Sequence, residues 1–203
     1  MTIEKGRAWG EPGPLPADGV LVRSDAEARA VVETARRAGE AVPALGLLGG
    51  DLCRTLGGRG DEDRMPGPEA MQLPVDVGAV LVDGRLHWFV APLVARRSWW
   101  RGRVVAAGNA QWLGAWNIAP RCHPNDGRLD LFDADLGFAQ RLGARRRLPS
   151  GTHLPHPGIT ERHVTATQVD LDPALDVWLD GDRLGRASKL SIRIEPDVLM
   201  CVV

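Results

Sequence analysis

The feature that most constrains the fold of this chain is a change in the period of its apolar residues near Val75. Before this point, the apolar residues between Ala28 and Ala35 recur at helical spacing. After it, apolar and polar residues alternate, as they do in half-buried strands. The change predicts an α+β fold, in which a small, reduced α/β unit is followed by a larger, mainly antiparallel β-sandwich.

The first half begins with an arm and continues as a strand, a helix and a second strand. Residues 1–18 are rich in glycine and proline, which predicts an irregular arm. Gly19–Arg23 predicts a short buried strand, and Ser24–Glu27 is a capping box that opens a helix ended by Gly39. Pro43–Leu48 predicts a second strand, which leads into a glycine-rich turn.

A linker follows this unit. Residues 57–74 contain many glycine, proline and acidic residues and few apolar ones. The expected organisation is therefore an arm at 1–18, a reduced α/β unit with its linker at 19–74, and a sandwich at 75–203. Because two strands with one or two helices leave apolar faces uncovered, we expect these faces to pack on the sandwich or against a second copy in a homo-oligomer.

Two Asp-Gly pairs predict tight hairpins in the second half, one at Asp83-Gly84 and one at Asp180-Gly181. Residues 136–148 have the pattern of the main helix of this half. The other predicted strands are 102–108, 113–118, 129–132, 163–171, 176–179, 189–195 and 198–203.

Composition excludes several classes of protein. The chain has 25 Lys and Arg against 26 Asp and Glu, a net charge of -1, which argues against nucleic acid as a partner. Its three cysteines, Cys53, Cys122 and Cys201, form no Cys-x-x-Cys pair, which favours a reducing compartment. No apolar run is long enough to span a membrane and the start has no apolar signal core, so we expect a cytoplasmic protein.

Four segments resemble the second domain of the diacylglycerol kinase and sphingosine kinase-like lipid kinases, a family within the NAD kinase-like superfamily. The segments occur in the family's order and with plausible spacing, and together they cover most of the second half. They are Asn109–Pro120, Asn125–Asp130, Gly151–Pro157 and Val177–Asp182.

The resemblance implies a nucleotide-binding α/β domain followed by a β-sandwich, with the active site in the cleft between them. It implies phosphorylation of a lipid hydroxyl with ATP and magnesium. Gly49, Gly50 and Asp51 stand where the family has its phosphate loop, and glycine amides at a helix start suit an anion. Arg54 could add a phosphate contact. The alternative for Gly49–Asp51 is an ordinary strand-to-helix turn with Asp51 as N-cap.

Two departures from the family pattern concern the nucleotide. Leu52 and Cys53 replace the glycine and threonine of the family's Gly-Gly-Asp-Gly-Thr loop, and a side chain at position 52 hinders close approach of phosphates. The residues before Gly19 also do not supply the strand and helix that open the family's first domain.

The resemblance also implies roles for acidic residues of the second half. Asp180 and Asp182 stand where the family has Asp-Gly-Glu facing the cleft, so they could orient a hydroxyl, act as a base or hold magnesium. The alternative is an exposed turn with solvated acids. Asp126 and Asp130 could hold a metal ion, or they are a turn acid and a strand acid.

Two further patterns allow more than one interpretation. His153 and His156, with His123, could bind zinc, although prolines on both sides of His156 favour a structural loop. Arg96–Arg103 interleaves arginines with Trp99-Trp100, which suits an interfacial patch on anionic lipid, base stacking, or a core tryptophan among solvated arginines.

The sequence therefore supports two functions. One is ATP-dependent phosphorylation of a lipid hydroxyl, or a weakened descendant of that activity, with a lipid substrate or a membrane surface as partner and a peripheral membrane location. The other is a non-catalytic family member that binds a lipid or a protein, or acts as a scaffold subunit. Leu52 and Cys53 favour lost activity, whereas Asp51, Asp180 and Asp182 favour its retention.

Overall fold

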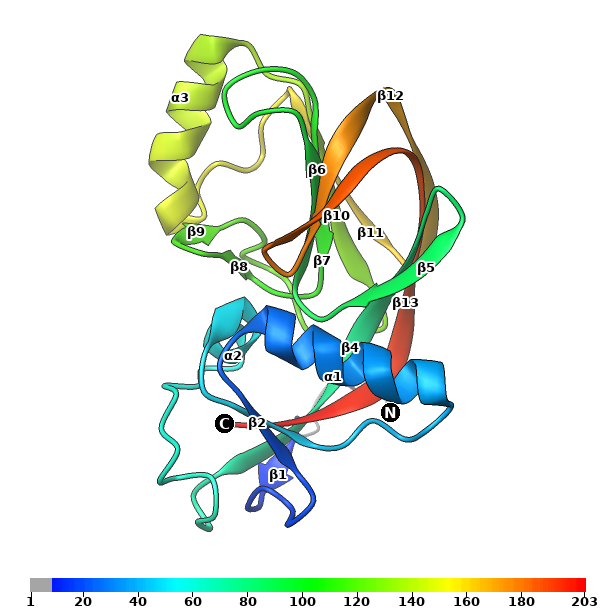
Figure 1. The fold of residues 1–203 in the computed structure, drawn as a ribbon. Coiled ribbons are helices and arrows are strands. Elements are labelled where there is room, and N and C mark those ends of the chain that lie inside the picture. Colours follow the sequence, from blue (N-terminus) through cyan, green and yellow to red (C-terminus); the bar gives the residue numbers. More distant parts are fainter. Residues whose placement is uncertain (1–8) are drawn as a thin grey trace.

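Most of the regular structure in the computed structural model, which describes residues 9–203, is antiparallel sheet (Figure 1). The elements in chain order are β1 (Glu11–Pro12), β2 (Val20–Val22), α1 (Asp25–Ala38), β3 (Leu45–Leu47), α2 (Gly50–Thr55), β4 (Met71–Val82), β5 (Arg85–Phe89), β6 (Pro92–Arg96), β7 (Val104–Gly108), β8 (Trp112–Leu113), β9 (Trp116–Asn117), β10 (Leu129–Ala134), α3 (Phe138–Arg147), the 3₁₀ turn η1 (Leu148–Ser150), β11 (Ile159–Val164), β12 (Ala166–Leu179) and β13 (Asp182–Val202).

One sheet runs through the whole described chain. Its strand order is β1-β4-β13-β12-β6-β7-β10-β11, with β5 paired to β4. The long strand β13 also joins the two halves, because Cys201 and Val202 at its end pair in parallel with Leu45 and Gly46 of β3, and β3 pairs in parallel with β2. The last residues of the chain therefore complete the sheet of the first half.

Helix α1 forms as the sequence predicts. The Ser24 hydroxyl accepts the Glu27 N–H at 3.2 Å, and Gly39 ends the helix in the left-handed conformation (φ 72°). The face that carries Ala28, Val32 and Ala35 is buried.

The first half packs on the second within the same chain. Val32 of α1 and Leu52 of α2 share a buried cluster with Val75 and Val77 of β4 and with Trp88 of β5. Of the two predicted coverings for the apolar face of α1, the sandwich is therefore the one observed. The expected homo-oligomer stays a prediction.

A second buried cluster fills the interior of the sandwich. Strands β4, β5, β6, β7, β10, β12 and β13 of the one sheet all contribute side chains to this core. Its fully buried members include Val80, Phe89, Leu93, Leu129, Val177 and Leu190.

Both Asp-Gly hairpins are confirmed. Asp83 and Gly84 have positive φ (44° and 86°), as do Asp180 and Gly181 (52° and 90°). Positive φ at both central residues is the type I′ turn, whose twist matches that of the flanking strands. The helix predicted at 136–148 is also present, as α3.

Several strand boundaries differ from the prediction. The expected strand at 113–118 is replaced by the short hairpin of β8 and β9, which turns at Gly114 (φ 57°). The strands expected at 189–195 and 198–203 belong to one strand, β13, which bulges near Asp197 (φ 55°) instead of ending.

The predicted linker and arm are also more regular than expected. The linker is shorter because β4 already begins at Met71. The arm is not wholly irregular, because β1 pairs with β4, while its residues 1–8 lie outside the described residues.

Burial of α1 on the sheet predicts unequal effects at two neighbouring valines. Val32 is fully buried and Val31 only partly so. We expect Val32→Ala to lower the free energy of unfolding by about 2 kcal/mol, because it removes buried methyl groups and leaves a cavity. Val31→Ala, with the same change in helix propensity, should cost less than half as much. Equal losses in urea unfolding would contradict the packing described here.

Candidate functional site

The predicted phosphate loop folds as a strand-to-helix turn whose first amides are already bonded. The Asp25 carboxylate accepts the N–H of Asp51 at 2.6 Å and the N–H of Leu52 at 3.1 Å. Gly50 has a φ of 97°, and a Cβ there would lie 2.4 Å from Asp25 Oδ1. The Asp25 carboxylate thus occupies the position in which a bound anion would accept these N–H groups.

The two departures from the family's loop pattern are core residues. Leu52 is fully buried, and the Cys53 thiol contacts the Leu47 carbonyl at 3.3 Å. Both side chains belong to the cluster between the two halves of the chain. At the two positions where the family has glycine and threonine, this chain therefore places core side chains.

The other two predicted loop residues hold the β8–β9 turn. Asp51 accepts the Gly114 N–H at 2.8 Å, and Arg54 donates to the Gly114 carbonyl at 3.0 Å. The Arg54 guanidinium also lies 3.4 Å from the centre of the Trp112 ring. Asp51 and Arg54 thus lie close together, but both bind the backbone of Gly114 and not a ligand.

Asp180 is a buried residue, which corrects the expectation of an exposed turn acid. Its carboxyl accepts the N–H of Val90 at 3.1 Å and of Ala91 at 2.8 Å. Burial raises the pKa of Asp180 well above its usual range, and the nearby Asp25 adds to the increase. Asp180 thereby fixes the turn between β5 and β6.

Asp182 lies in a different environment. Its side chain is 63% exposed and forms an ion pair with Arg29 of α1 at 2.6 Å. Arg29 also lies 3.9 Å from the Asp180 carboxyl. The Asp180–Asp182 turn and the Gly49–Asp51 turn therefore approach each other, with Asp25 and Arg29 of α1 between them.

The acids predicted to hold a metal ion lie on different elements. Asp126 accepts the Arg128 N–H at 2.9 Å within its own turn. Asp130 lies on β10, where its Oδ1 is 2.6 Å from His163 Nδ1 of β11. The structure pairs Asp130 with His163, a partner that the sequence prediction missed.

Asn109 and Asn125, which belong to the segments that resemble the lipid kinases, are held by Asp76, a fully buried residue of β4. Its side chain accepts the Gly127 N–H at 2.7 Å and the Asn125 Nδ2–H at 3.1 Å, while its carbonyl accepts from Asn109. Burial raises the pKa of the Asp76 carboxyl. These segments therefore meet as a structural network around one buried acid.

The histidine interpretation is not supported. His123 packs against Trp9 at 4.4 Å between ring centres, and the His156 Nδ1 accepts the Gly158 N–H at 3.0 Å. His153 is buried and bonds to the Ile118 carbonyl. Among residues 9–203, these three histidines form no cluster of metal ligands.

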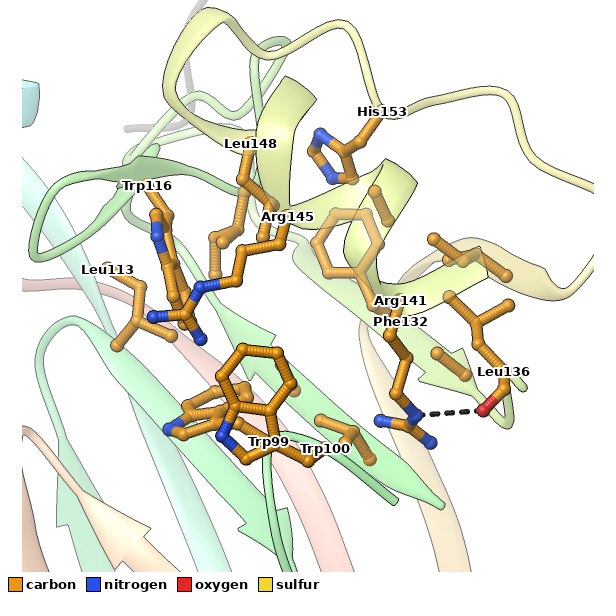
Figure 2. Close-up of a pocket in the computed structure, with 16 residues that line it drawn as sticks. Trp99, Trp100, Leu113, Trp116, Phe132, Leu136, Arg141, Arg145, Leu148 and His153 are labelled. Atoms are coloured by element: carbon orange, nitrogen blue, oxygen red, sulfur yellow. Dashed lines mark hydrogen bonds between the residues drawn. The ribbon is translucent and has the colours of Figure 1, made fainter. Parts of the chain in front are cut away.

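An apolar pocket of about 120 Å³ lies between α3 and the outer face of the sheet (Figure 2). Trp99 and Trp116 pack edge to face in its wall, 5.0 Å apart. The other side chains that give it an apolar lining are Trp100, Val104, Ala106, Leu113, Ile118, Phe132, Ala134, Leu136, Ala144, Leu148 and Ile159. The sequence showed the adjacent Trp99 and Trp100 and predicted the helix α3, but it did not predict that they line one pocket.

Three polar residues line the pocket, and they differ in their bonding partners. Arg141 is buried and donates to the Leu136 carbonyl at 2.8 Å and to Gly102. Arg145 lies over the rings of Trp100 and Trp116, at 4.7 and 5.0 Å, and has no ion-pair partner among the described residues. The buried Nδ1 of His153 also lacks a partner there.

Exposed apolar side chains lie near this pocket. Trp100 is 45% exposed and Phe138 65% exposed, with their rings 6.2 Å apart, and Leu142 of α3 is also exposed. Of the Trp99-Trp100 pair, one side chain therefore packs against the core and the other faces solvent. No helix in the described part of the chain is long and apolar enough to cross a membrane.

Comparison with known proteins identifies related domains and structures. A family model described as the YegS C-terminal NAD kinase beta sandwich-like domain matches residues 77–203. No curated protein matches the sequence significantly.

Solved structures of the same fold come from Bacillus anthracis str. Sterne. One, described as a diacylglycerol kinase, has a TM-score of 0.62 and 16% identity, over 91% of this chain and 75% of that chain. Two described as candidate diacylglycerol kinases have TM-scores of 0.73 and 0.69 at 14% identity, over 91% of this chain and 77% of theirs. At these identities the likeness shows the fold alone.

The burial of Asp180 predicts a loss of stability on its removal. Asp180→Ala leaves the N–H groups of Val90 and Ala91 unpaired, and we expect a loss of about 3 kcal/mol in the free energy of unfolding. Asp182→Ala removes an exposed ion pair and should cost less than about 1 kcal/mol. Urea unfolding of both variants tests the difference, and a stable Asp180→Ala protein would contradict it.

Burial raises the pKa of Asp25 to about 6, which predicts a pH dependence of stability. An acid with a raised pKa in the folded state holds its proton there, so stability falls as pH rises from about 4 to 6. Relative to Asp25→Asn, we expect the wild type to lose about 3 kcal/mol between pH 4 and 7. A constant difference between the two proteins over this range would show that Asp25 titrates normally.

Proposed function

The chain belongs to the family of the YegS C-terminal, NAD kinase beta sandwich-like domain. Within this family, we propose that it binds a lipid chain without transferring phosphate to it. The family and the names of the related structures suggest a lipid kinase-like function with ATP and magnesium. The apolar pocket under α3 is the observation that carries the proposal. The pocket supports binding of a lipid chain. The bonds from Asp25 to the amides of Asp51 and Leu52 argue against binding of a nucleotide at that turn.

The pocket suits part of an acyl chain. Its volume is about 120 Å³ and its wall is almost entirely apolar. An apolar cavity of about 150 Å³ accepts a benzene molecule, so several methylene groups fit in the space under α3. A longer chain would continue outward, past the exposed Trp100.

The charges around the pocket suit an anionic headgroup. Arg145 reaches into the pocket between Trp100 and Trp116 (Figure 2), held by aromatic rings alone. Arg146 and Arg147 follow it on α3, and both are exposed. A carboxylate or phosphate at the end of an acyl chain would give Arg145 the charged partner that it lacks among the described residues.

The same surface suits the headgroup layer of a membrane. Trp100 and Phe138 project into solvent, and the Arg145 guanidinium near the end of α3 lies 4.7 Å from the Trp100 ring. Exposed aromatic side chains next to cations are typical of proteins that lie on anionic lipid. This arrangement would place the pocket at the surface from which a lipid is taken.

The residues present do not fit a nucleotide. Phosphoryl transfer needs free amides and cations on the phosphates and a metal bridge. Here the amides of Asp51 and Leu52 bond to Asp25, and Arg54 is engaged on Gly114. The Asp180 carboxyl, the proposed base, is fully buried on the amides of Val90 and Ala91. These contacts favour the non-catalytic alternative.

A fatty acid with brominated carbons tests the lipid pocket, because bromine quenches tryptophan fluorescence on contact. We expect quenching in the wild type and its loss in Ala144→Phe, which fills the pocket from α3. Gly143→Phe puts the same ring on the preceding residue, where a Cβ meets only open space, and should quench like the wild type. Equal quenching in all three proteins would contradict the pocket assignment.

The same protein tests the absence of phosphate transfer. Ligands that bind only the native state raise the melting temperature. ATP with magnesium should leave the melting temperature unchanged and should give no labelled product with diacylglycerol. Turnover of diacylglycerol would establish the kinase alternative instead.

A further inference from the structure

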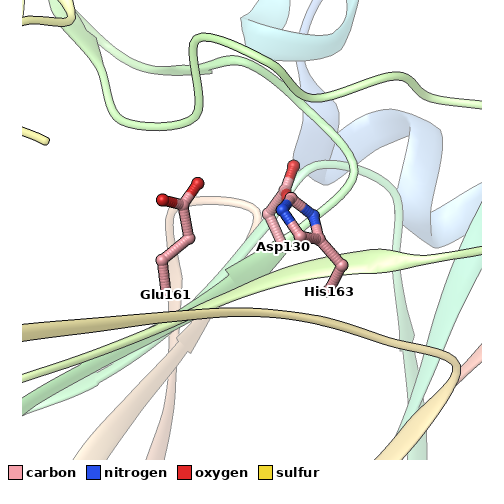
Figure 3. A group of neighbouring side chains, drawn as sticks. All are labelled: Asp130, Glu161 and His163. Atoms are coloured by element: carbon pink, nitrogen blue, oxygen red, sulfur yellow. The ribbon is translucent and has the colours of Figure 1, made fainter. Parts of the chain in front are cut away.

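Three possible metal ligands converge on the edge strand β11 and its neighbour β10, away from the predicted phosphate loop. Asp130, Glu161 and His163 each offer one ligand atom, and these atoms lie within 4.8 Å of one another. The strand register explains their convergence, because Asp130 pairs directly with His163 and Phe132 with Glu161. Side chains two residues apart on a strand share a face, and Figure 3 shows all three on one side of the two strands.

The group carries an excess of negative charge. Asp130 is buried, and its charged neighbours include Asp126 and Glu161 besides His163. Among the described residues, the Glu161 carboxylate has neither a hydrogen bond nor an ion-pair partner. His163 pairs with Asp130 and offers at most one positive charge, which does not neutralise the charges of these acids. A divalent cation would neutralise two of them.

The nitrogen and oxygen ligands that these three side chains offer indicate which metal ion the group would bind. One imidazole nitrogen and two carboxylates are a donor set for Zn²⁺ and neighbouring first-row metals, whereas Mg²⁺ and Ca²⁺ prefer oxygen alone. We propose that Asp130, Glu161 and His163 form a zinc site with a fourth position open to water. His163 is 44% exposed on its side chain, which leaves the ion a path from solvent.

The geometry needs only a small adjustment. At zinc–ligand distances of about 2.0–2.2 Å, two ligands of a tetrahedral site lie about 3.3 Å apart. Asp130 Oδ1 and His163 Nδ1 are 2.6 Å apart, held by a shared proton. Zinc would replace this proton, which passes to solvent, and the two atoms would separate by less than about 1 Å.

Two neighbours connect the site to the rest of the fold. The Cys122 thiol bonds to the Asp130 carboxyl and would orient it toward the ion. Phe132 and Ile159, on the same two strands, line the apolar pocket. A bound ion would therefore tie the edge strand β11, which forms part of the pocket wall, to β10.

Melting curves with zinc test the site, and they do not depend on lipid binding. Zinc added to metal-free wild type should raise the melting temperature, by an amount that grows with its concentration. His163→Ala and Glu161→Gln should lose this shift. Cobalt should give a tetrahedral visible spectrum with the wild type but not with His163→Ala.

A matched control comes from another histidine. His87 Nδ1 lies 3.6 Å from Glu33 Oε1, a histidine–carboxylate pair outside the three-residue group. His87→Ala should keep the full zinc shift. The proposal is wrong if wild type shows no zinc shift, if His163→Ala keeps it, or if magnesium at equal concentration produces it.

Discussion

The Asp25 carboxyl stands at the junction of the two halves of the chain. It lies at the start of α1, accepts the first amides of α2, and interacts with the buried Asp180 of the last hairpin. Arg29, one turn further along α1, lies between Asp180 and Asp182. One group of acidic side chains and their amide partners therefore links both helices to the last hairpin, beside the apolar cluster and the β13–β3 pairing that join the two halves.

This arrangement has a cost that the fold must offset. Two buried carboxyl groups next to each other resist ionisation, so burial raises both pKa values, that of Asp25 to about 6. Four backbone N–H groups, two for each acid, compensate part of the loss of hydration. A phosphate at the same amides would have to displace Asp25, and Leu52 beneath them is fixed in the core. Asp25 thus occupies the turn that the sequence predicted to bind phosphate.

The sequence predicted what depends on local signals. The capping box at Ser24, the two Asp-Gly turns and α3 follow from residues close together in the chain. It did not predict what depends on contacts between distant segments. Asp25 meets α2 after an intervening strand, and Asp130 meets His163 only through the pairing of β10 with β11. Single bends also escaped it. Gly114 splits a strand that periodicity alone would continue, whereas β13 continues through its bulge near Asp197, where the sequence predicted two separate strands.

The Asp25 side chain holds the amides of the turn that the sequence predicted to bind phosphate. The most direct measurement follows the amide signals of Asp51 and Leu52 by nuclear magnetic resonance during a titration with ATP and magnesium. We expect that neither signal moves with the nucleotide, while both move with pH near 6, as Asp25 gains a proton. A nucleotide-dependent shift of these two amides, saturating with concentration, would contradict it.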